Sequence, residues 1–318
     1  MKAPTIVAIG GHSLIDPDQP SAMDKQCAVT AKAMQHVADL VAQGEPIVLI
    51  HGNGPQAGWM QLRSVLAKGH LQEVPLDAIV ANTQGSLGYM LQRTLRQALK
   101  ERGVERPIAT LVTEVRVDPT DQAFEEPTKP IGNFYTDEEA QLLSQQFGWL
   151  MVEDSRRGYR RLVPSPSPVA IVQTEVIRQL IDAGTIVICC GGGGVPVTWQ
   201  EGGPIRGLEA VIDKDRVAAL LAVELGSPRL VITTGVDTVY TDFGTPQEAP
   251  LRDTHVEEVR HLARLGHFPP GSMRPKMEAS IYYLNRVDGE AVICSPSNLN
   301  EALAGESGTH IVRTTQRL

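Results

Sequence analysis

Three lysines stand in sequence contexts that are unusual for freely solvated side chains. Lys129 lies between two prolines in PTKP, Lys214 lies between two aspartates in DKD, and Lys276 follows a proline in RPKMEA. A single lysine is most often a surface residue, but rigid prolines and flanking acids are atypical of one. Converging ammonium groups stabilise the charge of a phosphoryl group in transfer, where catalysis is mainly positioning and electrostatics. The three lysines are therefore candidates to surround a transferring phosphoryl group.

Three glycine-rich segments each follow an apolar run of strand length. They are IGGHS at residues 9–13, HGNGPQAG at residues 51–58 and CCGGGGVPV at residues 189–197. Ligands of α/β sheets bind at the carboxyl ends of the strands, and glycine lets backbone N–H groups approach an anion closely. The segments predict one site for a highly charged ligand, most simply phosphate. Neither G-x-x-x-x-G-K-[ST] nor G-x-G-x-x-G with a ribose-binding acid occurs, so P-loop and Rossmann dinucleotide sites are not supported.

The elements that must position these residues alternate between strand-length apolar runs and longer helical patterns. The predicted strands are Ile6–Ile9, Ile47–Ile50, Ile108–Val112, Ile186–Cys190, Leu230–Thr233 and Ala291–Ile293. The predicted helices are Asp24–Gln43, Ala81–Arg102, Gln173–Ala183, Val217–Leu225 and Val256–Leu265. Near-continuous apolar strands indicate burial on both faces, and the first four helices each end at a glycine. The rhythm predicts a mostly parallel sheet with helices on both sides.

Two segments interrupt this rhythm. Residues 116–168 are polar and rich in proline and arginine, which predicts an inserted small lobe over the sheet. The run RRGYRR at residues 156–161 admits a nucleic-acid reading, but a charged β-turn in that lobe is the simpler interpretation. Residues 240–271 are expected to form a loop followed by a short helix.

Composition narrows the class of protein. The 318 residues are 42% hydrophobic and carry a formal net charge of −8. A chain of this length can bury a large core, and its acidic balance gives no support for nucleic-acid or anionic-membrane partners. No signal-peptide pattern or membrane-spanning run is found. The four cysteines contain no C-x-x-C pair, which favours reduced thiols in a cytoplasmic protein.

Six segments together resemble the signatures of carbamate kinase, in the amino acid kinase superfamily. They are HGNGPQAG, PTKPIG, GGGGVPV, EAVIDKD, VDTVYTDFGTP and PPGSMRPKMEA, and they occur in the order of that family over nearly the whole chain. The resemblance implies a three-layer α/β/α sandwich around a mostly parallel open sheet, with a small protruding subdomain. Residues 1–318 would form one domain, with 116–168 as the inserted subdomain.

The implied activity is reversible phosphoryl transfer between MgATP and carbamate, giving ADP and carbamoyl phosphate, often used toward ATP in catabolism such as that of arginine. The N-terminal part would bind the carbamate group and residues from about 185 to 318 the nucleotide. The resemblance also implies a homodimer. Mg²⁺ would be held mainly by phosphate oxygens and water, with Asp215 at most in an outer position and no protein metal site.

Residue roles are carried over by position. The acceptor side would comprise Gly10, Gly11, His12, Gly52, Asn53 and Gly54, with Lys129 reaching in from the subdomain. Lys214 and Lys276 would neutralise charge on the phosphoryl group and the ADP oxygens, and Asp215 would orient the lysines. The nucleotide side would comprise Gly191, Gly192 and Gly193 as the floor, and Asp237, Val239, Tyr240 and Met273 around adenine and ribose.

Two positions depart from the family pattern. The first glycine loop of the family continues with asparagine, and this chain has His12; the family usually has glycine where this chain has Arg274. His12 is compatible with three interpretations: a replacement hydrogen-bond donor to phosphate, a pocket re-cut for another small carboxylate or carbamate-like acceptor, or a nucleotide-binding paralogue without turnover. Outside this family, the alternatives are kinases of glutamate, aspartate or a nucleoside monophosphate.

Overall fold

The protein is built on one eight-stranded sheet. The computed structural model describes residues 2–15, 22–154, 157–269 and 271–314, and the His12 side chain lies outside that description. The strands of the sheet are β1 (Thr5–Ile9), β2 (Ile47–His51), β3 (Ile108–Thr110), β9 (Ile186–Ile188), β12 (Arg229–Thr233), β15 (Asp253–His255), β16 (Glu290–Cys294) and β17 (Thr309–Val312). Their spatial order is β15-β17-β16-β12-β1-β2-β9-β3. Among these pairings only β16 with β17 is antiparallel, so the predicted mostly parallel sheet is confirmed.

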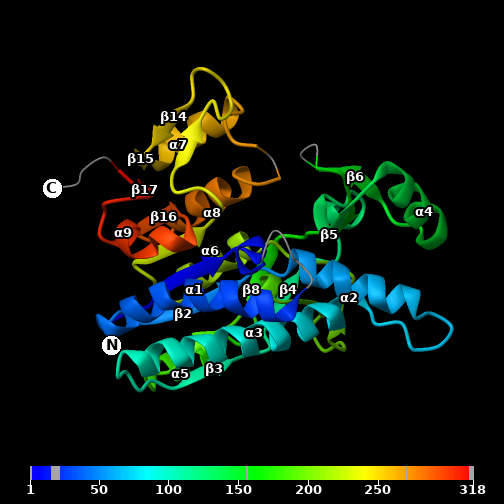
Figure 1. The fold of residues 1–318 in the computed structure, drawn as a ribbon, viewed down its shortest axis with the longest axis horizontal. Coiled ribbons are helices and arrows are strands. Elements are labelled where there is room, and N and C mark those ends of the chain that lie inside the picture. The colour runs from blue at the N-terminus through cyan, green and yellow to red at the C-terminus, as the bar shows by residue number, and fades with distance from the viewer. Residues whose placement is uncertain (1, 16–21, 155–156, 270, 315–318) are drawn as a thin grey trace.

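Helices cover both faces of this sheet, which gives the three predicted layers (Figure 1). One face packs against α1 (Met23–Ala42), α3 (Leu76–Glu101) and α9 (Leu299–Leu303). The other face packs against α5 (Thr174–Asp182), α6 (Lys214–Glu224), α7 (Val256–Arg264) and α8 (Arg274–Leu284). The predicted glycine stops are confirmed, since Gly103 (φ 67°) and Gly226 (φ 61°) adopt the left-handed conformation just beyond α3 and α6.

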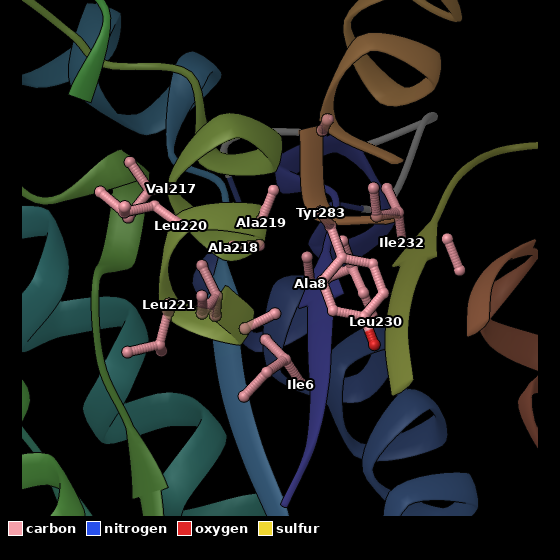
Figure 2. Close-up of a cluster of buried hydrophobic side chains, with 14 of the residues drawn as sticks. Ile6, Ala8, Val217, Ala218, Ala219, Leu220, Leu221, Leu230, Ile232 and Tyr283 are labelled. Atoms are coloured by element: carbon pink, nitrogen blue, oxygen red, sulfur yellow. The ribbon is translucent and has the colours of Figure 1, made fainter. Parts of the chain in front are cut away.

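The core follows from the period-2 alternation of the strands. Ile6 and Ala8 of β1 belong to the cluster beneath α6 and α8, whereas Val7 and Ile9 belong to the cluster beneath α1 and α3. Figure 2 shows Tyr283 of α8 beside β1 and β12, opposite the apolar face of α6. Lys214 begins α6, so burial of this helix fixes the position of one candidate catalytic residue.

A lobe projects away from the sheet (green, upper right of Figure 1). We use "lobe" for β5 (Lys129–Tyr135), α4 (Asp137–Phe147), β6 (Met151–Glu153) and β7 (Tyr159–Val163), whose strands pair in the order β5-β7-β6. A capping box between Thr136 and Glu139 begins α4. The lobe lies within the predicted insertion 116–168, and it rests on α2 (Gly54–Leu66) through a third apolar cluster.

The remaining elements are short. They are the sheet β11 (Arg206–Gly207), β10 (Val195–Thr198), β4 (Glu114–Val117) and β8 (Pro168–Ile171), the hairpin β13 (Val239–Thr241) and β14 (Ala249–Leu251), and the 3-10 turns η1 (Gly11–Leu14), η2 (Gln122–Phe124), η3 (Gly191–Gly193) and η4 (Pro296–Asn298). None of the described helices is long and apolar enough to cross a membrane.

Two expectations about local structure were wrong. HGNGPQAG is not only a loop, because α2 begins at Gly54 with Pro55 in its first turn. Residues 240–271 contain three short strands before α7 rather than a plain loop. The predicted charged β-turn in RRGYRR is supported, because the backbone N–H of Arg157 donates to the carbonyl oxygen of Asp154 at 3.1 Å between the paired strands β6 and β7. The end of the run belongs to β7, where Arg160 is 3% exposed. The first arginine of the run lies outside the described residues.

Candidate active site

A cleft of about 900 Å³ opens at the carboxyl ends of β1 and β2, between the lobe and the first turns of α6 and α8. It brings together most of the predicted residues. The predicted residues that line it are Gly10, Gly11, Gly52, Asn53, Gly54, Lys129, Gly192, Lys214, Asp215 and Lys276. The three glycine-rich segments therefore do converge on one site.

The glycines at the cleft are required by close backbone contacts. A Cβ on Gly52 would lie 2.7 Å from the backbone N of Gly11, and a Cβ on Gly11 would lie 3.1 Å from the carbonyl carbon of Gly52. The loops after β1 and β2 therefore touch backbone to backbone. A Cβ on Gly192 would overlap the side-chain amide of Asn53 at 2.1 Å. Side chains at these positions would separate the loops that form the cleft floor.

Asp213 joins the lobe to α6. Its Oδ1 accepts from the backbone N–H groups of Asp215 (2.9 Å) and Arg216 (3.4 Å), so it is the N-cap of α6. Its Oδ2 accepts from Lys129 Nζ at 2.8 Å. Lys129 comes from β5, so this ion pair holds a lobe residue over the start of α6.

Asp215 holds the other two lysines. One carboxylate oxygen is paired with Lys214 Nζ, and the other accepts from Lys276 Nζ at 2.8 Å. The side chains of Lys214, Asp215 and Lys276 are 10%, 3% and 13% exposed. Because Lys214 begins α6 and Lys276 lies in the first turn of α8, one buried carboxylate fixes both helix starts.

The charges of this cluster do not cancel. Three ammonium groups face two carboxylates, which leaves one positive charge in a poorly solvated cleft. Burial acts to raise the pKa of Asp213 and Asp215, but the neighbouring lysines outweigh it and hold both pKa values below the usual range. Burial lowers the pKa of Lys214, whereas Asp215 outweighs burial at Lys276 and raises its pKa. An anion is the ligand that such a cluster favours.

The floor beneath the cleft is packed with polar side chains. Asn53 is 2% exposed, and its Nδ2 donates to Thr83 Oγ1 of α3 at 2.8 Å. His51 Nδ1 lies 3.1 Å from the carbonyl oxygen of Gly52. Burial lowers the pKa of His51 to about 4, with the Gly52 hydrogen bond opposing it. A Cβ on Gly191 would lie 2.3 Å from His51 Nε2, so Gly191 packs beneath the cleft and does not line it.

Several predicted nucleotide-side residues lie outside the lining of this cleft. Asp237 is exposed, Val239 is buried in the core, and Tyr240 is half-buried against Phe243 with ring centroids 6.2 Å apart. Met273 caps the start of α8 directly beside the cleft-lining segment 274–276. Gly193 packs on Ile212. Their role in a nucleotide pocket stays a prediction, as does any role of His12.

Asp213 and Arg160 are among the cleft-lining residues that were not predicted. Asp213 was noted only as a flank of Lys214, although an aspartate before an apolar helix is a recognisable N-cap signal. Arg160 lines the cleft from the lobe, and the arginine-rich run offered no periodic signal that one side chain turns inward. Among the described residues, no three His, Cys, Asp or Glu side chains gather as a metal site.

Comparison with known proteins agrees with this architecture. The profile described as "Amino acid kinase family" matches residues 3–295. The carbamate kinase of Clostridium perfringens is 42% identical over 97% of this chain and 99% of its own, and the carbamate kinase-like protein YahI of Escherichia coli is 42% identical over 99% and 100%. The solved structure of Giardia lamblia carbamate kinase bound to AMP-PNP has a TM-score of 0.89 at 36% identity, covering 98% of this chain and 99% of its own. The chain therefore belongs to the amino acid kinase family, in the group formed by carbamate kinases and carbamate kinase-like proteins.

Proposed function

We propose that this protein is a carbamate kinase, which transfers a phosphoryl group reversibly between MgATP and carbamate and so produces ADP and carbamoyl phosphate. The observation that carries this proposal is the cluster of Lys129, Lys214 and Lys276 held by two aspartates in the glycine-lined cleft. Its support is the similarity of nearly the whole chain to carbamate kinases. We propose that the cell uses it toward ATP, in catabolism such as that of arginine.

The arrangement suits in-line phosphoryl transfer without a covalent enzyme intermediate. In such reactions negative charge spreads over the phosphoryl oxygens, and the protein contributes position and cationic charge. Lys129 approaches from the lobe toward the acceptor, Lys214 faces the phosphoryl group, and Lys276 neutralises the oxygens of ADP. Asp215 orients the latter two lysines. Mg²⁺ enters as part of the nucleotide substrate, because the carboxylates of Asp213 and Asp215 are already engaged by ammonium groups.

We propose further that the N-terminal part of the chain binds the carbamate group, and that residues from about 185 to 318 bind the nucleotide. Asp237, Val239, Tyr240 and Met273 are the proposed adenine and ribose contacts. We also propose a homodimer in the cytoplasm.

A second candidate is a related kinase whose acceptor is another small carboxylate. Two observations favour keeping it: His12 stands where the family pattern has asparagine, and relatives named only "carbamate kinase-like" are as similar as named carbamate kinases. The first candidate predicts that His12→Asn changes the pH dependence of the turnover rate, and that carbamate remains the acceptor in both proteins.

A comparison of acceptors separates the two candidates. ADP release from MgATP would be measured with ammonium bicarbonate, which supplies carbamate, and with acetate, glutamate and aspartate at matched concentrations. The proposal expects turnover with the carbamate source and background rates with the other three. Faster turnover with any of the carboxylates would establish the second candidate instead.

A further inference from the structure

Arg160 is an almost fully buried arginine in which the nitrogens that carry three of its five N–H donors have no hydrogen-bond partner among the described residues. It lies in β7 of the lobe, is 3% exposed, and donates through Nη1 to Asp154 Oδ2 at 3.1 Å. Its Nε and Nη2 are buried and have no hydrogen-bond partner within the described part of the chain. A buried, charged donor without a partner destabilises the folded state by more free energy than the loss of an ordinary hydrogen bond. A stable fold retains such a group when a ligand supplies the missing acceptor.

The orientation of the guanidinium group is fixed. Asp154 holds one end, and the Cζ atom lies 5.2 Å from the centroid of the Phe134 ring. Nε and Nη2 share the edge of the guanidinium group that presents two parallel N–H bonds. That edge matches the two oxygens of a carboxylate in the bidentate geometry. The unused edge of Arg160 is therefore shaped for a planar anion rather than for a single point charge.

The same edge lies over the start of α2. Arg160 lines the cleft, and its Nη2 is 3.9 Å from the place that a Cβ on Gly54 would occupy. Gly54 is the first residue of α2, whose N-cap Asn53 makes no side-chain capping bond. The first N–H groups of a helix have no partner within the helix and favour an anion. The guanidinium group of the lobe and the start of the helix thus lie next to each other.

This place is distinct from the lysine cluster but close to it. A Cβ on Gly52 would lie 3.2 Å from Lys214 Cδ, so Lys214 stands over Gly52 while Arg160 stands over Gly54. Two residues of chain span at most about 7 Å. This is the scale of a small acceptor joined to a phosphoryl group.

We propose that Arg160 and the first turn of α2 form the subsite for the planar, non-transferred end of the acceptor, the carboxylate-like carbamate group. The inference rests on the proposed function and adds a specificity-determining residue to it. Arg160 selects an acceptor with two coplanar oxygens, which in carbamoyl phosphate are the carbonyl oxygen and the bridging oxygen, while the lysines receive the phosphoryl group. Asp154 is a positioning residue that keeps the unused edge turned toward Gly54.

The test is the kinetics of Arg160→Ala and Arg160→Lys with carbamoyl phosphate and MgADP. Loss of a charged bidentate contact should raise the KM for carbamoyl phosphate roughly 10- to 100-fold, while the KM for MgADP stays within about twofold. Lysine should not restore the low KM because it cannot present two parallel donors, whereas added guanidinium ion should partly rescue the alanine variant. Equal increases in both KM values, or an unchanged KM for carbamoyl phosphate, would overturn the inference.

Arg157→Ala is the matched control. Arg157 is 57% exposed, lies 3.9 Å from the same Asp154, and stacks on the same Phe134 ring, but it does not line the cleft. This variant should keep both KM values. If Arg157→Ala raises the KM for carbamoyl phosphate as much as Arg160→Ala does, positive charge anywhere in the lobe would account for binding. The two unpaired nitrogens of Arg160 beside Gly54 would then have no specific role.

Calorimetry with phosphonoacetamide, an analogue of carbamoyl phosphate that cannot transfer its phosphoryl group, separates this inference from the proposed function. If the wild type binds the analogue and Arg160→Ala binds it roughly 10-fold or more weakly, the subsite stands even without turnover. If the wild type turns over and both proteins bind the analogue equally, the subsite is wrong and the proposed function survives. Circular dichroism of each variant establishes that it is folded.

Discussion

At the residue scale, the site depends on two aspartates that each join chain segments far apart in sequence. Asp213 joins β5 to α6 and Asp215 joins α6 to α8. Removing one partner of such a buried group leaves the other charge unpaired, which is more damaging than losing an exposed ion pair. Substituting a buried lysine of the cleft should therefore have a much larger effect than substituting an exposed lysine elsewhere.

Lys214→Ala and Lys276→Ala should each lose most of the turnover, by roughly 100-fold or more, because each removes a donor that stabilises transition-state charge. Steady-state rates would be compared with those of Lys68→Ala. Lys68 is 69% exposed and pairs only with Glu73 at 3.1 Å among the described contacts, so its variant should be near normal. Near-normal rates for the two cleft variants would show that their assigned roles are wrong.

His51 should make stability depend on pH. Its pKa is about 4 in the folded protein because burial disfavours the charged ring, and about 6.5 when the chain is unfolded. Between those values only the unfolded chain binds the proton, so the free energy of unfolding falls as pH is lowered from 6.5 to 4, by up to about 1.4 kcal/mol per pH unit.

Urea unfolding at several pH values in this window would measure that slope for the wild type and for His51→Gln. The variant should show a shallower slope, and His70→Gln, which removes an exposed histidine, should match the wild type. Identical slopes in all three proteins would contradict the assignment of a neutral, buried His51.

At the element scale, the contact between α2 and the lobe sets where Lys129 lies. A Cβ on Gly58 of α2 would lie 2.1 Å from the Cα of Gly132 in β5. Both atoms belong to the backbone, so a methyl group at Gly58 forces the lobe away from the helix. Lys129 and Arg160 would then move relative to the glycine loops.

Gly58→Ala should therefore lower stability by roughly 1–3 kcal/mol and raise the KM for carbamoyl phosphate. Gly85→Ala in α3 is the control, because a Cβ there meets nothing within 4 Å. It should leave activity unchanged and add roughly 0.5–1 kcal/mol through helix propensity. Thermal unfolding and steady-state kinetics of both variants measure these effects. Equal stability and equal KM values in the two variants would refute the close contact between Gly58 and Gly132.

Many of the helices and strands could be predicted from the sequence. Continuous apolar strands and glycine helix stops are local signals, so the parallel sheet and four helix ends were predictable. The start of α2 was missed because its first turn, GPQAG, is rich in turn residues. The inward turn of Arg160 was missed because it depends on partners, Asp154 and Phe134, that only the folded lobe brings together. The lysines were predictable from their neighbours, but their pairing with Asp213 and Asp215 required the tertiary fold.

At the scale of the whole molecule, the cleft is assembled from the lobe, three glycine-rich segments and the starts of α2, α6 and α8. A ligand that binds only this assembled state stabilises it by mass action. AMP-PNP with Mg²⁺ at about 100 times its Kd should add roughly 2.7 kcal/mol to the free energy of unfolding. Scanning calorimetry measures the shift in unfolding temperature. No shift at saturating AMP-PNP would contradict the proposal that the cleft binds nucleotide.

The most direct measurement is ATP formation from carbamoyl phosphate and MgADP, followed in a coupled assay for the wild type beside Lys276→Ala. The account predicts sustained turnover by the wild type that requires both substrates and falls roughly 100-fold or more in the variant. Folded wild-type protein that forms no ATP above the spontaneous breakdown of carbamoyl phosphate would contradict it.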